Sequence, residues 1–525
     1  MNSRRQLVAS ISALWLACCQ LIALLPADDH SIASSLAQKE NDDGWMVTAG
    51  PNGRIMTMEL TLYAAAEPRP ALKYQLIPDE YDRLEGNAAV YYLRALGFLE
   101  RDAARRELER FHEEQLQKAR ESGVELTQVP PYIWQSTPPD ELPRDEVKKY
   151  LELTAFQTHL LREAARRDRF DMERRFKTLD NPCSYLLPDI QVMRQLARTQ
   201  RIRCRLAIAE GRIEDALEIL GQQFALARHL GQDEFLVSGL MGMAVIGVAW
   251  QDALYLVQHP DTPNLYWALA ALPKPIVSIR RSLANERQFP YAQFKSLREI
   301  DSIPRPAAYW QEFLDRLADE LQRVDFELLG MVPKDQPKLT RAALAAYVAD
   351  AYPGARDFLL TELKMTEKQI DALPTAQVVL LACVRFYDQW RDELLKWTYL
   401  PLARCRSNSN YRDMETRYKK ATARFGKCTA PTEAFLPVIR HVAVSAARMD
   451  HDLAMLQTVE AIRMYAAAHN NTLPRSLDDL PVPAPITEYT GKPIAYELQG
   501  DHATLIGSSF PGIQRRLILR IAERK

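Results

Sequence analysis

The residues of this chain that could do chemistry are scattered rather than grouped. Its nine histidines show no metal-ligand spacing, and the nearest case, His441 and His451, are ten residues apart on one predicted helix. The chain contains no HExxH, GxSxG, P-loop or GxGxxG motif, so the usual signals for zinc, acyl-transfer and phosphate chemistry are missing. The sequence therefore predicts no catalytic, cofactor-binding or metal-binding residues, and it favours core or surface roles for the histidines.

Aromatic side chains are the next candidates, because they could line a ligand groove. Those at helical spacing are Tyr91, Tyr92, Trp390, Trp397 and Tyr399. Aromatic residues in such stripes belong to a core more often than to a groove, so we expect core positions here.

The elements that must position any site are mainly helices. The chain has 525 residues, of which 47% are hydrophobic and 26% charged, so it can bury a large core. Thirty-two prolines against 19 glycines favour helices broken by rigid connectors over a β-rich fold. The formal net charge of −1 lacks the basic footprint of a nucleic-acid-binding protein. We expect a mainly α fold, an irregular α-solenoid or helical-hairpin array, with a small α+β C-terminal module.

Residues 189–258 form the predicted centre, read as a helix, a tight turn, a second helix and a long apolar helix. Gly211 and Ala216 lie at the turn of the predicted hairpin. Residues 235–250 carry no charge, so that helix is expected to be buried nearly all round. Its glycines, Gly239, Gly242 and Gly247, are expected to permit close helix packing.

The C-terminal part changes character after a predicted helix over residues 431–469. Residues 494–498 and 503–506 are two short apolar runs separated by a glycine-containing turn, which is typical of a β-hairpin. Residues 515–525 are expected to be a solvated tail. Upstream, residues 404–428 are polar and basic, and we expect a mobile loop there.

The N-terminus has the features of an export signal. Arg4 and Arg5 precede an uncharged run over residues 7–25, and Ala27 offers a cleavage site. We expect a signal peptide over 1–27 and an exported, periplasmic or cell-envelope location. The alternatives are an uncleaved membrane anchor through residues 7–25 and a lipid-modified Cys18. A flexible linker is expected over 28–56, an α-helical body over 57–454 and the α+β module over 455–525.

Five cysteines remain after residue 27, and an odd number excludes complete intramolecular pairing. Cys405 and Cys428 flank a polar stretch and are the candidate disulfide pair. Most of the five are expected to be buried small hydrophobic residues.

Residues 210–217 resemble the turn of a tetratricopeptide repeat. Gly211 and Ala216 supply the small residues that such a helix crossing requires. No regular 34-residue period follows, so the resemblance implies an irregular helical array rather than a true repeat array.

Residues 457–507 are similar to the periplasmic part of type II secretion pseudopilins, through Ile462, a Leu-Pro pair at 473–474 and the run 490–496. That family packs a long helix on a small sheet. Glu488 and Tyr489 replace the Asp-Pro that usually precedes Thr-Gly, which weakens any analogy to calcium binding. The resemblance makes the following residues candidates for interaction: Tyr489, Gly491, Lys492 and Tyr496. Together with residues 65–74 and 86–89, the same tail resembles a set of exported planctomycete proteins without a known activity.

Three functions remain open at this stage. The first is an exported, non-enzymatic binding or scaffolding protein that uses helical surfaces for a protein partner and needs no cofactor. The second is a secretion-system accessory that docks through the pseudopilin-like tail. The third is an envelope-polymer hydrolase whose catalytic carboxylates the sequence does not identify. Glu121 and Ser122 resemble the catalytic pair of soluble lytic transglycosylases, but the rest of that motif does not follow.

Overall fold

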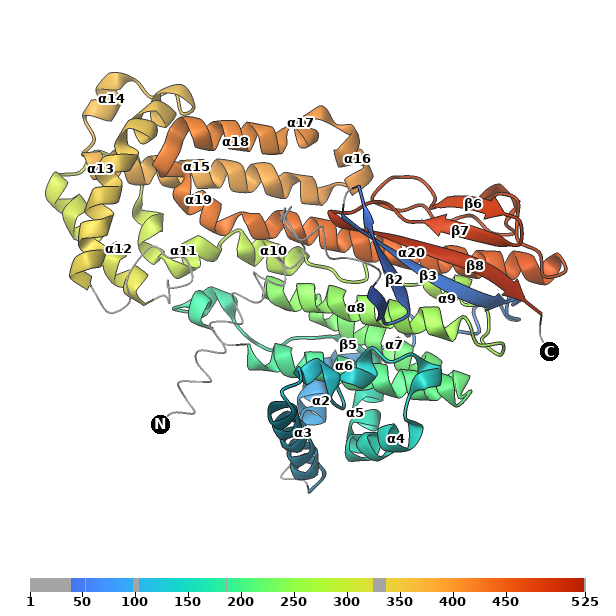
Figure 1. The fold of residues 1–525 in the computed structure, drawn as a ribbon. Helices are drawn as coiled ribbons and strands as arrows, with labels where there is room; N and C mark the ends of the chain where they lie inside the picture. Colours follow the sequence, from blue (N-terminus) through green and yellow to red (C-terminus); the bar gives the residue numbers. More distant parts are fainter. Residues whose placement is uncertain (1–38, 52, 98–102, 186, 324–336, 524–525) are drawn as a thin grey trace. The chain divides into compact units, whose positions relative to one another are not determined.

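The computed structural model describes residues 39–51, 53–97, 103–185, 187–323 and 337–523 (Figure 1). The protein is mainly helical and has strands in its C-terminal part, as the sequence predicted, and these strands belong to a six-stranded sheet that also includes residues 39–63. It forms two compact units, each made of segments that are far apart in the sequence. Within the described residues, unit 1 holds 175–185 and 283–444, and unit 2 holds the rest. The units therefore differ from the predicted ranges 57–454 and 455–525. The predicted signal peptide over 1–27, with the tether at 7–25, lies outside the described residues.

Unit 2 contains the sheet and the predicted central helices. Its helices of five or more residues are α2 (Ala88–Ala95), α3 (Ala103–Ser122), α4 (Arg144–Leu153), α5 (Ala155–Ala165), α6 (Pro188–Ala209), α7 (Ile213–Leu230), α8 (Leu236–Leu256), α9 (Tyr266–Ala270) and most of α20 (Pro437–Ala468). Its strands are β1 (Lys39–Asp42), β2 (Trp45–Gly50), β3 (Gly53–Tyr63), β4 (Leu84–Asn87), β5 (Arg167–Arg169), β6 (Ala495–Gln499), β7 (His502–Ile506) and β8 (Gly512–Ala522).

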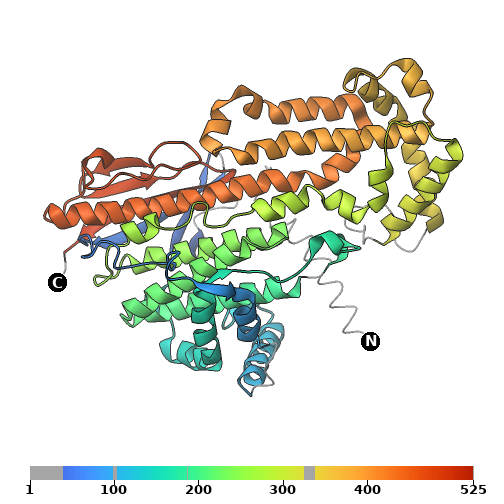
Figure 2. The ribbon, with the colours of Figure 1, turned by 180° about the vertical axis from the view of Figure 1, so that it is seen from behind.

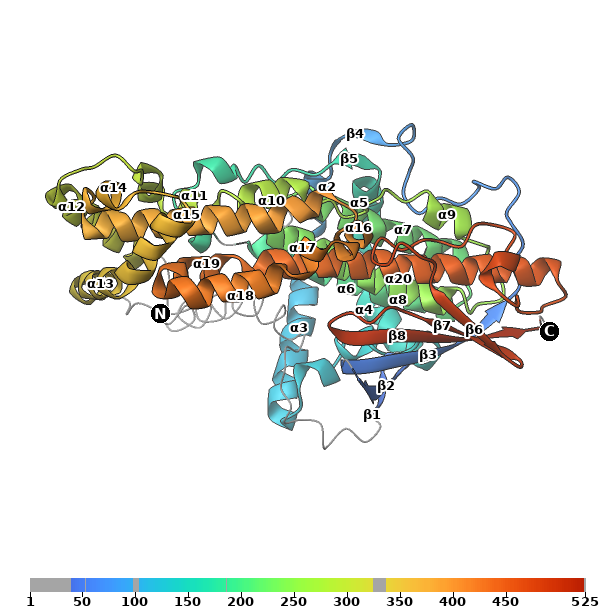
Figure 3. The ribbon, with the colours of Figure 1, turned by 90° about the horizontal axis from the view of Figure 1, so that it is seen from above.

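The larger sheet joins the two ends of the described chain. Its order is β1-β2-β3-β8-β7-β6, and β3 pairs with β8 in parallel over 11 residues, from Gly53 opposite Gly512 to Tyr63 opposite Ala522. One face is buried, because Met58 and Leu60 on β3 point the same way as Leu517 on β8. Helix α20 runs beside these strands (Figure 3). The predicted hairpin is confirmed, since β6 and β7 pair antiparallel from Ala495 opposite Ile506.

Two predictions about chain segments in this sheet are wrong. The second half of the linker predicted over 28–56 contains β1, β2 and the start of β3. The tail predicted over 515–525 contains most of β8, an interior strand of the sheet. Both segments have polar or mixed sequences, which hides their strand character. β1 and β2 pair with neighbours close in the sequence, whereas β3 and β8 pair with each other across more than 400 residues, which no local pattern reveals.

Helices α6, α7 and α8 form the core of unit 2, as predicted. Gly211 has a φ of +70° in the α6–α7 turn, and Ala216 is fully buried. On α8, a Cβ at Gly242 would meet the carbonyl oxygen of Ala227 at 2.7 Å, and one at Gly239 would meet Ile279 at 2.8 Å. The prediction fails at Gly247, where a Cβ would have no neighbour within 4 Å.

Among the helices that the structure describes, α8 alone has the length and apolar composition needed to cross a membrane. Two-thirds of its most apolar window is buried inside the protein, as in the core helix of a soluble protein.

A buried charge network fastens the β1–β2 turn to the helices of unit 2. Arg205 on α6 has a fully buried guanidinium that binds Asp252 of α8 at 3.1 Å and Asp43 of the turn at 2.7 Å. Tyr255 donates a hydrogen bond to the same Asp43 at 3.2 Å. Next to it, Trp45 of β2 stacks on Trp250 of α8 with ring centroids 5.7 Å apart.

A second buried pair fastens α20 to the end of β3. Arg463 and Glu460 are both fully buried and lie 2.9 Å apart. The Arg463 guanidinium also donates to the carbonyl oxygens of Tyr63 and Thr262, at 3.0 and 2.8 Å. Since these two carbonyl oxygens belong to the end of β3 and to the segment that follows α8, Arg463 holds three parts of the chain together.

Unit 1 is all helical in the part that the structure describes. Its helices are the end of α10 (Arg280–Glu286), then α11 (Phe289–Gln293), η6 (Lys295–Glu299), α12 (Ala307–Gln322), α13 (Pro337–Thr361), α14 (Glu367–Asp371), α15 (Thr375–Leu395), η8 (Lys396–Tyr399), α16 (Leu402–Ser407), α17 (Ser409–Arg412), α18 (Met414–Phe425), η9 (Gly426–Thr429), α19 (Ala430–Phe435) and the start of α20.

The mobile loop predicted over 404–428 is wrong, because this stretch forms α16, α17 and α18. Helix α18 lies along α15, with the Trp390 and Tyr418 rings 5.0 Å apart (Figure 2). Only a narrow side of α18 packs on the core, with Met414 and Phe425 buried and Tyr418 partly buried between them. Basic residues occupy much of the rest of the helix, so this apolar spacing was not recognised in the sequence.

The predicted disulfide between Cys405 and Cys428 is also absent, because both are buried free thiols. The Cys405 thiol faces the carbonyl of Trp397 at 3.5 Å, and the Cys428 thiol faces that of Phe425 at 3.3 Å. Buried free cysteines agree with the alternative that the sequence left open.

Two of the three glycines of α8, Gly242 and Gly247, give a matched test of this packing. We expect Gly242→Ala to lower the free energy of unfolding by about 1–3 kcal/mol, because its Cβ overlaps a backbone carbonyl. We expect Gly247→Ala to raise it by about 0.5–1 kcal/mol, because alanine favours a helix and meets no neighbour. Urea unfolding followed by tryptophan fluorescence measures both, and equal effects of the two substitutions would contradict the packing described.

Candidate functional site

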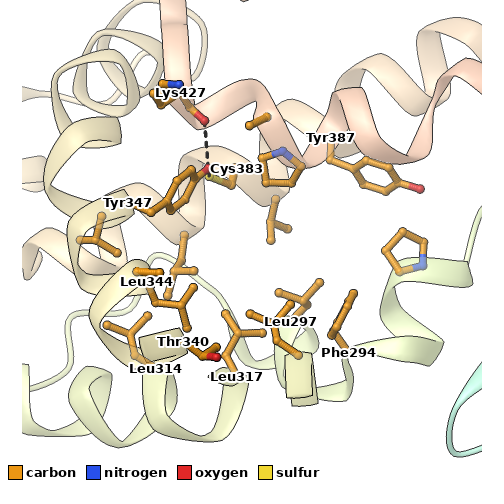
Figure 4. Close-up of a pocket in the computed structure, with 18 of the residues that line it drawn as sticks. Phe294, Leu297, Leu314, Leu317, Thr340, Leu344, Tyr347, Cys383, Tyr387 and Lys427 are labelled. Carbon is orange, nitrogen blue, oxygen red and sulfur yellow. Dashed lines mark hydrogen bonds between the residues drawn. The ribbon is translucent and has the colours of Figure 1, made fainter. Parts of the chain in front are cut away.

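A cavity of about 390 Å³ lies inside unit 1, bounded by α11, η6, α12, α13, α15 and the η9–α19 segment (Figure 4). Its walls are almost entirely apolar and are dominated by leucines such as Leu297, Leu317 and Leu344. The volume falls within the range of about 300–1,000 Å³ that is usual for small-molecule sites. The cavity is therefore large enough to take a ligand rather than a single water molecule.

The walls come from three helices that each present apolar residues at a spacing of three or four. These residues are Leu314, Leu317 and Leu321 on α12, Ala343, Leu344 and Tyr347 on α13, and Leu380, Cys383, Val384 and Tyr387 on α15. The spacing places each set on one face of its helix. Because Ala343, Cys383 and Val384 are small, the facing helices pack around an open space instead of filling it.

One wall is fixed where α13 meets the end of α18. A Cβ at Gly354 would overlap the carbonyl group of Phe425, so only glycine allows this approach. One turn further along α13, the Phe358 ring packs edge-on against Phe386 and Phe425 at 5.5 and 5.2 Å. The contact holds α13 against η9, the segment that carries Lys427.

Few polar groups line the cavity, and the hydroxyls of Tyr347, Tyr291 and Thr340 bond to other protein groups. The Tyr347 hydroxyl donates to the carbonyl of Lys427 at 2.9 Å and lies 3.3 Å from the Cys383 thiol. The Tyr291 hydroxyl donates to Asp388 at 2.7 Å, and the Thr340 hydroxyl accepts a hydrogen bond from Gln322. A ligand would therefore not have to supply hydrogen bonds to these hydroxyls.

The thiol and phenol groups on the wall are held neutral. Burial raises the pKa of the Cys383 thiol to about 11, and burial also raises the pKa values of Tyr347 and Tyr387. A thiol with a raised pKa is a poor nucleophile at neutral pH. The described lining residues include no Asp, Glu or His to serve as a general acid or base. The arrangement can bind an apolar molecule, and it offers little for transforming one.

The aromatic residues considered as candidates for a ligand groove differ in their burial. Tyr92 and Trp390 are buried core residues, as expected, whereas Tyr399 is 77% exposed. His451 is also a core residue, since burial lowers its pKa to about 4 and its Nε2 accepts a hydrogen bond from Ser508 at 2.9 Å. The side chain of His441 lies outside the described part of the chain. Across the described residues, no group of three potential ligands could hold a metal ion.

The four interaction candidates of the C-terminal module lie together in unit 2 but differ in exposure. Tyr489 packs on Phe510 with ring centroids 4.3 Å apart, and the Tyr496 hydroxyl donates to the carbonyl of Pro474 at 2.6 Å. Gly491 adopts a φ of +68° in the turn, and Lys492 is exposed beside it. Only Gly491 and Lys492 are exposed, so the two tyrosines serve mainly the packing of the module.

Strand β6 forms one outer edge of the larger sheet. Its hairpin has a two-residue turn, since Gln499 pairs with His502. In such a hairpin the residues at alternate positions, here Tyr496 and Leu498, turn their backbone groups away from β7. Four of the five residues of β6 are exposed, and Leu498 is 38% exposed.

The cavity was not predicted from the sequence. The helices that form it were expected near residues 340–352 and 376–399, but their relative placement was not. The one sequence feature that could have indicated a cavity was a set of smaller residues, at positions 340, 343, 383 and 384. They lie opposite positions occupied by leucine. Helical periodicity identifies the inward face of a helix, but it does not show whether that face is filled.

Comparisons with protein-family models, with curated proteins and with solved structures give no match to this chain. The resemblances to tetratricopeptide repeats, pseudopilins and planctomycete proteins therefore rest on the quoted residues alone.

Proposed function

We propose that this protein is a non-enzymatic binding protein and that unit 1 takes an apolar ligand into its cavity. The observation that carries the proposal is a space of about 390 Å³ with leucine-rich walls and polar groups that bond within the protein. An apolar molecule in this space would bury apolar surface of the lining and gain dispersion contacts with it.

The proposed location is the cell envelope, and it rests on the basic residues and apolar run at the N-terminus. An envelope offers many apolar molecules that need a protein to carry or hold them in water. Binding is favoured over hydrolysis because the cavity wall combines a thiol of raised pKa with apolar side chains.

Filling the cavity tests the proposal. We expect Ala343→Phe to weaken binding of the uncharged fluorophore N-phenyl-1-naphthylamine at least about tenfold, because the new ring occupies the space where the probe lies. The measurement is fluorescence titration of the full chain, with circular dichroism to confirm the fold.

Ala345→Phe is the matched control, since Ala345 lies on the same helix but faces solvent. It should bind the probe like the wild type. Equal probe binding by wild type and Ala343→Phe would mean that the cavity is not the site.

A second candidate function is docking of a protein partner along β6, favoured by the exposed outer edge of that strand. Tyr496 and Leu498 offer outward backbone groups, and an extended segment of a partner could extend the sheet there. The short length of β6 and the charge of Glu497 are also what a sheet uses to protect an edge. The partner would be a protein with an extended segment, and no nucleic acid is involved.

A proline on β6 tests whether this strand is a docking edge or only a protected edge. We expect Leu498→Pro to abolish capture of a partner from envelope extracts, because it removes an outward N–H without breaking the pairing with β7. Leu498→Ala, which keeps that N–H, should retain the partner. If both variants capture the same proteins as the wild type, β6 is not a docking edge.

A further inference from the structure

Among its described lining residues, the cavity of unit 1 has a single residue of a charged type, which bears on the kind of ligand it takes. Among the described lining residues, Lys427 is the only one with a charge, and its side chain is exposed. It lies on η9 directly after Gly426, whose φ is +58°. An exposed lysine alone is an ordinary solvated side chain. Its position at an apolar cavity sets this one apart.

Among the described residues of unit 1, three cations near Lys427 in the sequence are ion-paired, whereas Lys427 and Lys420 are not. Arg424 pairs with Asp357 at 2.8 Å, and Lys419 pairs with Glu415 at 3.0 Å. Arg417 pairs with Glu393 at 2.7 Å. Within the described part of the chain, the Lys427 ammonium makes no hydrogen bond or ion pair, although its carbonyl accepts from Tyr347. A cation at an apolar site without a partner on the protein is suited to an anion on the ligand.

The rest of the lining is suited to hydrocarbon. The hydroxyls of Tyr347, Tyr291 and Thr340 all bond to protein groups, so a polar ligand group placed among them would lose its own hydrogen bonds to water. Methylene groups carry no such penalty and gain from burial.

The labelled side chains give the cavity a direction. Lys427 and Tyr347 lie at one end, and Tyr387 and Phe294 lie at the other (Figure 4). Behind the second end, Asp388 accepts from Tyr291 and pairs with Arg391 at 2.6 Å, so its charge is already compensated. A chain entering beside Lys427 therefore runs towards the end formed by Tyr387 and Phe294.

Building on the proposed function of unit 1, we infer that the ligand is a single-chain amphiphile with an anionic head. Its hydrocarbon chain lies between α12, α13 and α15, and its head pairs with Lys427. The shared chemistry is that of a long-chain carboxylate, whether it comes as a free fatty acid or as the acidic end of a larger molecule.

The test compares dodecanoate with its methyl ester, which has the same chain and no charge. Affinities are measured by displacement of the fluorophore from the full chain, below the concentration at which either probe forms micelles. At low ionic strength the wild type should bind the carboxylate about three- to fivefold more tightly than the ester, as expected for one solvent-exposed ion pair. Added salt should reduce that preference.

Lys427→Gln should abolish the preference while leaving the affinity for the ester unchanged. Lys420→Gln is the matched control, because Lys420 is an exposed lysine of the same unit that does not line the cavity. It should keep the full preference.

The outcomes separate the two proposals. Equal binding of carboxylate and ester by the wild type, or a preference that survives in Lys427→Gln, overturns the anionic head but leaves the apolar site. Failure of the wild type to bind either probe overturns both.

Discussion

The contact between Gly354 and the backbone of Phe425 is the constraint on which unit 1 depends. Any side chain at Gly354 would overlap the Phe425 carbonyl, so this glycine sets how closely α13 approaches the end of α18. The rings of Phe358, Phe386 and Phe425 then pack around the contact. The close approach occurs at Gly354, away from the small side chains of Ala343 on α13 and of Cys383 and Val384 on α15. The helices therefore leave a space open beside these three residues. The cavity therefore remains because the close-packed contact at Gly354 and Phe425 fixes the position of α13 beside it.

Unit 2 is held together differently, by buried charged side chains that bind groups far away in the sequence. The guanidinium of Arg205 holds Asp43 against α6 and α8, and that of Arg463 holds the end of β3 against α20. Such groups are costly to bury unless every hydrogen bond is satisfied. Here each one ties an N-terminal strand to a helix much further along the chain. These attachments hold the β1–β2 turn and the end of β3 beside the helices of unit 2.

The parts of the fold that the sequence predicted are those set by local periodicity. The hairpin of α6 and α7, the buried helix α8 and the β6–β7 turn follow from apolar spacing and from glycines such as Gly211. The strands at 39–63 and the strand β8 were missed because they are stabilised by each other, and α18 because only its narrow stripe is buried. The cavity required the distance between helices, which depends on single contacts such as Gly354 with Phe425. Lys427 shows no local signal at all, since its role comes from its position at the cavity.

Native mass spectrometry of the full chain, purified without detergent, tests the central claim most directly. Binding of one amphiphile per chain in the cavity of unit 1 predicts a bound state that is one ligand heavier than the protein. It should appear on purification or on addition of dodecanoate, and organic extraction should remove it. A chain that shows only its own mass, even with dodecanoate in excess, would contradict the claim that unit 1 is built to bind an apolar ligand.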